Sequence, residues 1–123
     1  MRFMLLCYDD EAAWQRLGDA ALRAAMQEAV ELTHELNAKG QYYVASPLEA
    51  VRTAKSVRVR DGKVLVTDGP FAETREQLGG FYLIEAKDQD EAVAIAARHS
   101  GARLGTVEVR PILEIEGLPA SNQ

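Results

Sequence analysis

Four short segments rich in apolar residues predict β-strands. Residues 2–8 and 81–86 carry apolar side chains at both odd and even positions, which is the pattern of strands covered on both faces. Residues 42–45 are mostly aromatic or β-branched, and residues 106–115 alternate between apolar and polar side chains. The chain therefore predicts a sheet in which two strands lack a polar face.

Two segments have the three- and four-residue spacing of amphipathic helices. The first ends at Gly40 and follows a separate helical turn over residues 12–17, which Gly18 breaks. Its apolar stripe consists of Leu22, Met26, Ala29, Thr33 and Leu36. The second covers residues 88–101 and opens with the spacing of a capping box.

Residues 56–67 predict a β-hairpin. Asp61-Gly62 stands between two alternating runs, and this dipeptide favours the positive φ angles of a two-residue turn. Counting outward from the turn pairs Val59 with Val64, Val57 with Val66 and Arg58 with Leu65. One side of the hairpin is therefore apolar and the other mostly polar.

Without the hairpin, the order of elements is β-α-β-β-α-β, the ferredoxin-like arrangement of the α+β class, with both helices on one face of an antiparallel sheet. Residues 1–116 are expected to form one domain, and residues 117–123 a flexible tail. Because two strands are apolar on both faces, something must cover the second sheet face. The simplest cover is a second copy of the same sheet, so we expect a homodimer.

Composition narrows the classes of partner. The chain has 123 residues, with 14 Lys and Arg against 19 Asp and Glu, and a net charge of -5. This charge repels phosphate and anionic lipid, so we expect no nucleic-acid and no membrane partner. Cys7 has no second cysteine to pair with, and the apolar start is too short for a signal segment, so we expect a cytoplasmic protein.

The sequence lacks the motifs of several common functional sites. With two histidines and one cysteine there is no CxxC or HExxH motif, so we expect no metal site. There is no GxSxG motif, no P-loop and no dinucleotide fingerprint, so we expect no cofactor. Cys7 lies inside a strand with two apolar faces, where a thiol has a raised pKa and acts as a small hydrophobe rather than a nucleophile.

Asp68 begins the densest group of turn residues, Asp68-Gly69-Pro70-Phe71. Proline fixes its own φ and displaces the residue before it from the helical region, so Asp68 is held at a rigid corner after a strand. Its carboxylate is either a site residue or a cap for the turn. Phe71 is most simply an anchor that holds the loop to the core.

Three segments, TDGPFAETREQLGGFYLIEA, MRFMLLCYDDEAAW and GTVEVRPI, resemble the YCII-related family and, within it, the DGPF-motif branch. The resemblance runs in unbroken order through nearly the whole chain. It implies a dimeric α+β barrel, in which two ferredoxin-like sheets face each other. It also implies a link to extracytoplasmic-function sigma factors, which DGPF proteins often accompany. The family is suspected of enzymatic activity because a histidine and an aspartate approach each other in a cleft of some members.

The resemblance assigns roles to individual residues. Asp68, Phe71 and Glu73 belong to the DGPF block, and Arg110 to the VEVRP block. We expect Asp68 to be a catalytic acid or base, with His99 as the second catalytic candidate. Arg110, Glu73 and Phe71 are the ligand-binding candidates.

The two histidines differ in position. His99 ends the second helix, where the helix dipole favours an imidazolium, so it either caps the helix or reaches a cleft as a proton carrier. His34 lies six residues before Gly40, which does not match the spacing of the family histidine. It is expected to border the apolar stripe without a chemical role.

The predicted function is binding of a small polar or anionic metabolite, with or without turnover, in a homodimer cleft lined by Asp68 and Arg110. Arg110 pairs either with an internal carboxylate, from Asp68 or Glu73, or with an anionic ligand. The alternative is a regulatory interaction protein associated with a sigma factor, for which the acidic surface suits a basic partner.

Overall fold

The computed structural model describes residues 1–120. Four strands form an antiparallel sheet in the order β2-β5-β1-β6, and two form a separate hairpin. The strands are β1 (Arg2–Asp9), β2 (Tyr42–Pro47), β3 (Lys55–Arg60), β4 (Lys63–Asp68), β5 (Gln77–Glu85) and β6 (Thr106–Pro111). The helices are α1 (Glu11–Leu17), α2 (Asp19–Ala38), α3 (Gln89–Ala97) and α4 (Gly101–Leu104), with a 3-10 turn η1 (Val51–Thr53). The predicted ferredoxin-like α+β fold with an inserted hairpin is confirmed.

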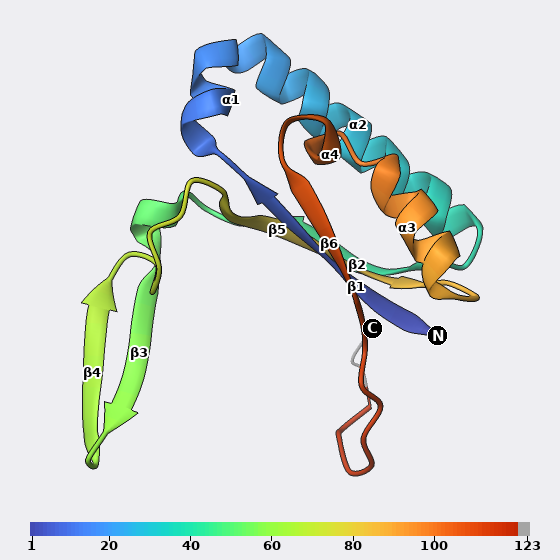
Figure 1. The fold of residues 1–123 in the computed structure, drawn as a ribbon. Coiled ribbons are helices and arrows are strands. Elements are labelled where there is room, and N and C mark those ends of the chain that lie inside the picture. The colour runs from blue at the N-terminus through green and yellow to red at the C-terminus, as the bar shows by residue number, and fades with distance from the viewer. Residues whose placement is uncertain (121–123) are drawn as a thin grey trace.

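Side-chain caps and one glycine set the helix boundaries. Asp10 accepts a hydrogen bond of 3.0 Å from the backbone N–H of Ala12 and opens α1. Asp88 accepts one of 2.8 Å from the N–H of Glu91 and opens α3. Gly18, with φ 93°, separates α1 from α2 as the sequence predicts. Figure 1 shows α2 and α3 over the same face of the four-stranded sheet.

The core lies between that sheet face and the helices. Alternate residues of β1 and β5 point toward the helices, since successive side chains of a strand face opposite ways. The largest fully buried side chains are those of Phe3, Leu5, Leu36 and Ile84. From α2, Leu32 and Leu36 join this core, whereas Leu22 and Met26 of the predicted apolar stripe stay partly exposed.

The opposite sheet face carries no helix (Figure 1). Two rows of directly paired residues cross its four strands. One row is Val44, Leu83, Met4 and Arg110, and the other is Ser46, Phe81, Leu6 and Glu108. The two central residues of each row are apolar, and Arg110, Ser46 and Glu108 stand at the ends. We call this surface the open face.

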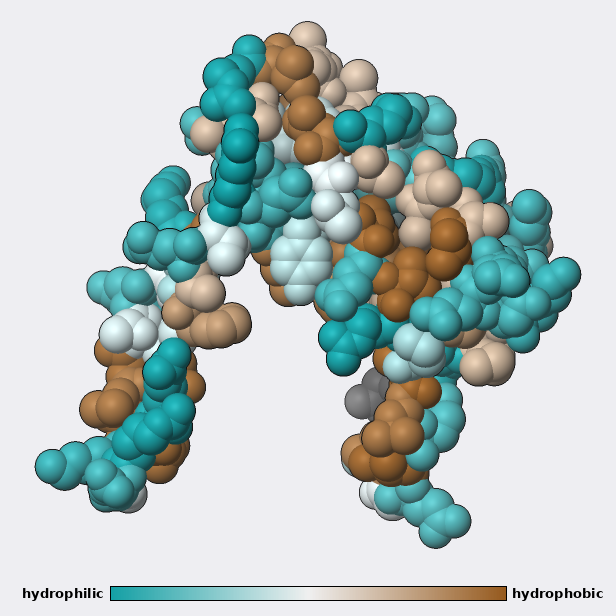
Figure 2. Space-filling view, viewed as in Figure 1, coloured by the Kyte–Doolittle hydropathy of each residue, from teal (hydrophilic) through white to brown (hydrophobic). Residues whose placement is uncertain are grey.

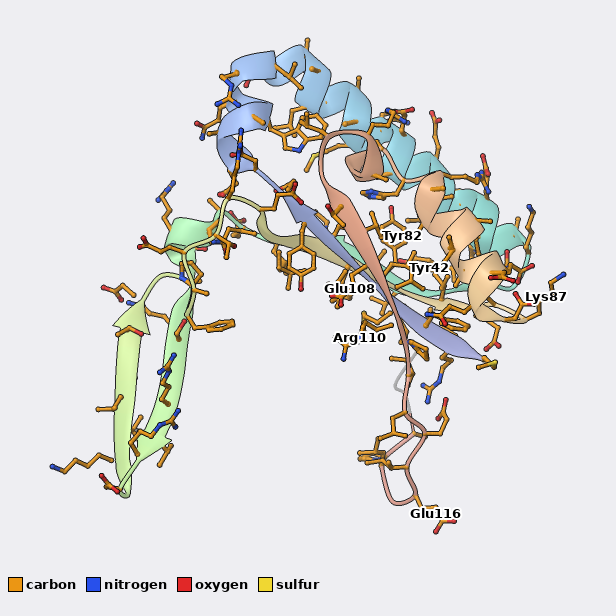
Figure 3. The ribbon with its side chains drawn as sticks, viewed as in Figure 1. Tyr42, Tyr82, Lys87, Glu108, Arg110 and Glu116 are labelled. Atoms are coloured by element: carbon orange, nitrogen blue, oxygen red, sulfur yellow. The ribbon has the colours of Figure 1, made fainter. Side chains whose placement is uncertain are left out.

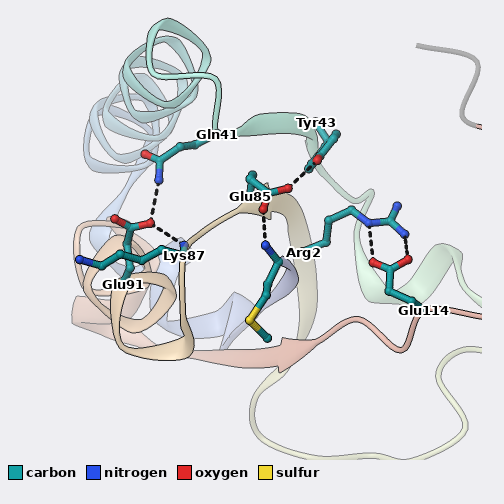
Figure 4. Close-up of polar contacts among 8 residues, drawn as sticks. Arg2, Gln41, Tyr43, Glu85, Lys87, Glu91 and Glu114 are labelled. Atoms are coloured by element: carbon teal, nitrogen blue, oxygen red, sulfur yellow. Dashed lines mark hydrogen bonds and ion pairs between the residues drawn. The ribbon is translucent and has the colours of Figure 1, made fainter.

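Polar side chains contact one another across the sheet at the start of β1 (Figure 4). The Arg2 guanidinium holds the Glu114 carboxylate through two hydrogen bonds, of 3.0 and 2.5 Å. The Tyr43 hydroxyl donates a hydrogen bond of 2.7 Å to Glu85, which also pairs with the N-terminal ammonium. These contacts are exposed, so each contributes little to the stability of the fold. They hold the N-terminus and the segment after β6 against the sheet.

The hairpin has the predicted register, with Val57 opposite Val66 and Val59 opposite Val64. Its turn residue Asp61 has φ 52°, as a two-residue turn requires. The hairpin projects away from the sheet on the side opposite the helices, and Figure 2 shows its apolar surface uncovered. All four valines are more than half exposed.

The last strand is shorter than predicted. It was expected over residues 106–115, but β6 ends at Pro111. The N–H of Ile112 bonds to the carbonyl of Arg2 at 2.9 Å, and the ladder ends there because Arg2 is the first residue of β1. Beyond this point Leu113 is 82% exposed. Residues 112–120 contain no helix or strand, and residues 121–123 of the predicted tail lie outside the described residues.

Gly105, which links α4 to β6, has no room for a side chain. A Cβ atom there would lie 2.1 Å from the backbone carbonyl oxygen of Tyr8. Gly105→Ala is therefore expected to lower the free energy of unfolding by about 3 kcal/mol, measured by urea denaturation.

Gly40→Ala is the control, because Gly40 has φ 72° and open space around it. There the cost is that of the left-handed backbone alone, about 1 kcal/mol. Equal losses in the two variants would show that the close approach at Gly105 does not constrain the chain.

Candidate functional site

A cavity of about 310 Å³ lies between α2 and strands β2, β5 and β1. It continues to α1 and to the α3–α4 junction, because Trp14 and His99 belong to its lining. We call it the α2 pocket. Its size suits a small ligand.

Two hydroxyl groups contact the backbone of α2 at the pocket. The Tyr82 hydroxyl donates a hydrogen bond of 3.2 Å to the carbonyl of Ala29, and the buried Ser100 hydroxyl donates one of 2.8 Å to that of Ala25. All four of these residues belong to the pocket lining. Met26, from the predicted apolar stripe, lines the pocket and stays 48% exposed.

One end of the pocket is formed by a tyrosine and a histidine. The ring of His99 meets that of Tyr82 edge to face, with centroids 5.1 Å apart and planes at 82°. His99 Nδ1 accepts a hydrogen bond of 3.0 Å from the N–H of Gly101, so the neutral ring carries its proton on Nε2. Figure 3 shows Tyr82 and Tyr42 on the helix side of the sheet.

His99 does not carry the charge that the helix dipole predicts. Burial lowers its pKa, and the positive charge of Arg103 lowers the pKa further, while Glu28 acts in the opposite direction. The expected imidazolium cap is therefore wrong: the ring is half-buried against Tyr82, where the uncharged form is favoured.

Asp9 lines the pocket as well. Its carboxylate lies against Gly79, where a Cβ atom would be only 3.1 Å from Oδ1. Burial raises the pKa of Asp9, and the charges of Glu11, Asp10 and Glu76 raise it further. A half-buried carboxylate and a half-buried histidine thus share one cavity. A pair of shifted groups in a cavity is typical of a functional site.

The neighbouring carboxylates have structural roles instead. Asp10 caps α1 and lies 3.4 Å from the Nε of Arg75. Glu11 accepts two hydrogen bonds, of 3.0 and 3.2 Å, from the N–H of Val51 and so holds η1. Asp9 is the residue of this acidic run that faces the pocket.

Cys7 behaves as the sequence predicts. Its side chain is buried, and burial raises the pKa of its thiol to about 11. It lines the pocket as a small apolar surface, since a thiol with this pKa is almost wholly protonated near neutral pH.

The site residues predicted from the DGPF block lie outside the α2 pocket. Asp68 ends β4 with a side chain that is 83% exposed, and it pairs with Lys55 of the facing strand. Phe71 is 79% exposed and Glu73 is exposed too, so Phe71 does not anchor the loop to the core of this chain. None of the three lines the α2 pocket.

Arg110 lies on the open face, where Figure 3 shows it beside Glu108. The two side chains approach to 3.5 Å. The predicted internal partners were Asp68 and Glu73, but among the described residues it is Glu108, two positions away on the same strand, that pairs with Arg110. The structure therefore brings His99 into a cavity and leaves Asp68 and Arg110 on separate sheets.

Sequence reasoning missed Asp9 and Tyr82 as site residues. One signal for Asp9 was available, because it ends a strand with two apolar faces and opens an acidic run. Tyr82 contacts α2 through a hydrogen bond to a residue 53 positions away in sequence. A contact over this sequence distance cannot be predicted from local residue patterns.

Within residues 1–120, no three His, Cys, Asp or Glu side chains group as a metal site would require. No helix in the same part of the chain is long and apolar enough to cross a membrane.

Fold and cavity together define a small ferredoxin-like α+β protein with a partly enclosed pocket beneath its first long helix. The model of the YCII-related domain matches residues 1–116, and the chain belongs to this family. The match is to the family as a whole, and the DGPF-motif branch stays a prediction.

Two similar proteins extend the comparison. The uncharacterized protein R00369 of Rhizobium meliloti (strain 1021) is 36% identical over 117 residues, which cover 91% of this chain and 92% of that protein. The solved structure of 5-chloro-2-hydroxyhydroquinone dehydrochlorinase (TftG) from Burkholderia phenoliruptrix AC1100, in complex with 2,5-dihydroxybenzoquinone, superposes with a TM-score of 0.53. It is 17% identical, and the match covers 94% of this chain and 97% of that one. At this identity, the similarity shows the fold.

The pKa of His99 makes a prediction about stability. Because the folded state lowers this pKa, the unfolded chain binds the extra proton first, and stability falls as the pH drops below about 6.5. His99→Gln lacks this proton site, so the stability advantage of the wild type over the variant should shrink from pH 7 to pH 5. Urea denaturation at both values measures it, and a constant difference would contradict a buried neutral ring.

Proposed function

We propose that this protein binds a small molecule in the α2 pocket, as an enzyme or as a binding protein. The observation that carries the proposal is the presence of Asp9 and His99, both with shifted pKa values, in the lining of one cavity. Titratable groups of this kind are expected where a site binds or transforms a ligand. Apolar walls beside them would hold the body of the molecule.

His99 has a definite part in this proposal. With Nδ1 engaged by the Gly101 N–H, Nε2 is the nitrogen that donates to a ligand. In a reaction, the ring accepts a proton only after a change of tautomer or loss of the Gly101 contact, because Nδ1 already accepts the Gly101 N–H. His99 is thus first a hydrogen-bond donor, and a proton carrier if there is turnover.

The same proposal includes a homodimer formed through the open face. The apolar rows across β2, β5, β1 and β6 are matched to no element of their own chain. The hairpin that carries the exposed valines projects on the same side, and so does the C-terminal segment that contains the exposed Leu113 (Figure 1). A second copy would bury all three surfaces together.

The predicted Asp68 and Arg110 cleft becomes part of this dimer. Arg110 stands at the end of an open-face row, and Asp68 lies at the base of the projecting hairpin. A cleft that contains both, with Glu73 and Phe71, would have to be completed between subunits. A regulatory link to a sigma factor stays a prediction of the resemblance, and no feature of residues 1–120 or of the similar proteins speaks for it.

Ligand binding is tested by thermal shift with a panel of small phenols, amines, acids and phosphates. A compound at about a hundred times its dissociation constant stabilises the fold by about 2.7 kcal/mol. We expect His99→Gln to weaken the response of any compound that stabilises the wild type. His34→Gln is the matched control, since His34 lies exposed on α2 and outside the pocket.

Two further variants distinguish a ligand in the α2 pocket from a ligand in the intersubunit cleft. If Asp68→Asn or Arg110→Ala removes the response while His99→Gln retains it, the ligand lies in the intersubunit cleft and the assignment to the α2 pocket is wrong.

The dimer is tested by substitution at Leu83, which lies on a central strand within an open-face row. Leu83→Lys places a charge in the proposed interface, so we expect the mass measured by light scattering to fall from that of a dimer to that of a monomer. Val93→Lys, at a half-exposed position of α3, should leave the mass unchanged. A monomeric wild type would refute the dimer.

A further inference from the structure

Asp9 differs from the other carboxylates around it. Asp10 has Arg75 as a partner, and Glu11 has the N–H of Val51. No Lys, Arg or His side chain of residues 1–120 forms an ion pair with Asp9. Its carboxylate therefore enters the α2 pocket without an ion-pair partner, although a hydrogen bond from the Trp14 side chain lowers its pKa in part.

The charges that act on Asp9 are all of its own sign. They come from Glu11, Asp10 and Glu76, and each disfavours a further negative charge at this end of the pocket. Because the site is partly enclosed, these charges act more strongly on a ligand than they would in open water. An anion is repelled here, and a cation is attracted.

The rest of the pocket lining offers no compensating positive charge, because no Lys or Arg of residues 1–120 belongs to it. His99 is kept neutral by burial. The guanidinium of Arg103, its nearest charged neighbour on α4, pairs with Glu28 at 2.5 Å. An anionic ligand would thus meet a carboxylate at one end and an uncharged ring at the other.

The walls between the two ends are apolar or aromatic. Trp14 and Tyr8 lie in the same lining as Asp9, with Leu22 and Met26 from α2 above them. Aromatic faces stabilise a nearby cation through their quadrupole, and they also pack against a ring. A cavity of about 310 Å³ has room for one ring with a short side chain.

We propose that the α2 pocket takes a small amine, in which a ring-sized apolar body carries a protonated nitrogen that pairs with Asp9. This rests on the proposed function, because it names the class of ligand for the same pocket. The amine replaces the anionic metabolite that Arg110 led us to expect. Asp9 is then the residue that sets ligand charge, and His99 binds the opposite end of the molecule.

Three compounds of matched size test the charge preference: 2-phenylethylamine, 2-phenylethanol and phenylacetate, each titrated calorimetrically into the full-length protein at pH 7.5. We expect the amine to bind at least about tenfold tighter than the alcohol, which is the gain from a charge-assisted hydrogen bond. Phenylacetate should bind most weakly of the three.

Asp9→Asn removes the charge and keeps the shape of the side chain. It should bring the affinity for the amine down to that for the alcohol, and leave the alcohol itself unchanged. Asp19→Asn is the matched control, because it removes a carboxylate from the exposed first turn of α2. This control should keep the full preference for the amine.

Two results would overturn the inference: the first leaves the proposed function standing, and the second refutes it too. If the wild type binds the amine no tighter than the alcohol, or if Asp9→Asn keeps the preference, the pocket binds ligands but Asp9 does not select them. If the wild type binds none of the three compounds, the proposed function falls, and the amine falls with it.

Discussion

The structure depends on a mismatch between sheet and helices. β1 and β5 have apolar side chains on both faces, but the helices cover one face only. On the covered face, Phe3, Leu5 and Ile84 lose all contact with water and supply most of the hydrophobic stabilisation. On the open face, residues of the same strands stay half-buried. Within the described residues, every buried side-chain polar group has a hydrogen-bond partner, but the apolar open face of the sheet stays uncovered.

The same covered face explains the pocket. Two hydroxyl groups in the pocket lining, from Tyr82 of β5 and from Ser100 before α4, donate hydrogen bonds to backbone carbonyls of α2. Buried hydroxyls require such partners, and these two tie the helix to the elements around the cavity. Cavity and acid groups thus come from different parts of the chain: α2 supplies the roof, and the end of β1 supplies Asp9.

The sequence predicted the elements well because their signals are local. The hairpin register follows from a two-residue turn, and the break at Gly18 follows from one glycine. The end of β6 could not be predicted, because it depends on where the neighbouring strand begins. Among the candidate site residues, His99 was left between a helix cap and a cleft, and the burial that lowers its pKa depends on neighbours distant in sequence, such as Tyr82. The chemistry of the site is set by such long-range contacts.

The projecting hairpin has a consequence for how the protein folds. A two-stranded hairpin is marginally stable in water by itself, and β3 and β4 pair only with each other. The hairpin forms quickly, since its contacts are close in sequence, but its persistence requires contacts that its own chain does not provide. In the proposed assembly, those contacts arrive in a bimolecular step. The order of this segment would then depend on protein concentration, whereas the folding of the sheet and helices would not.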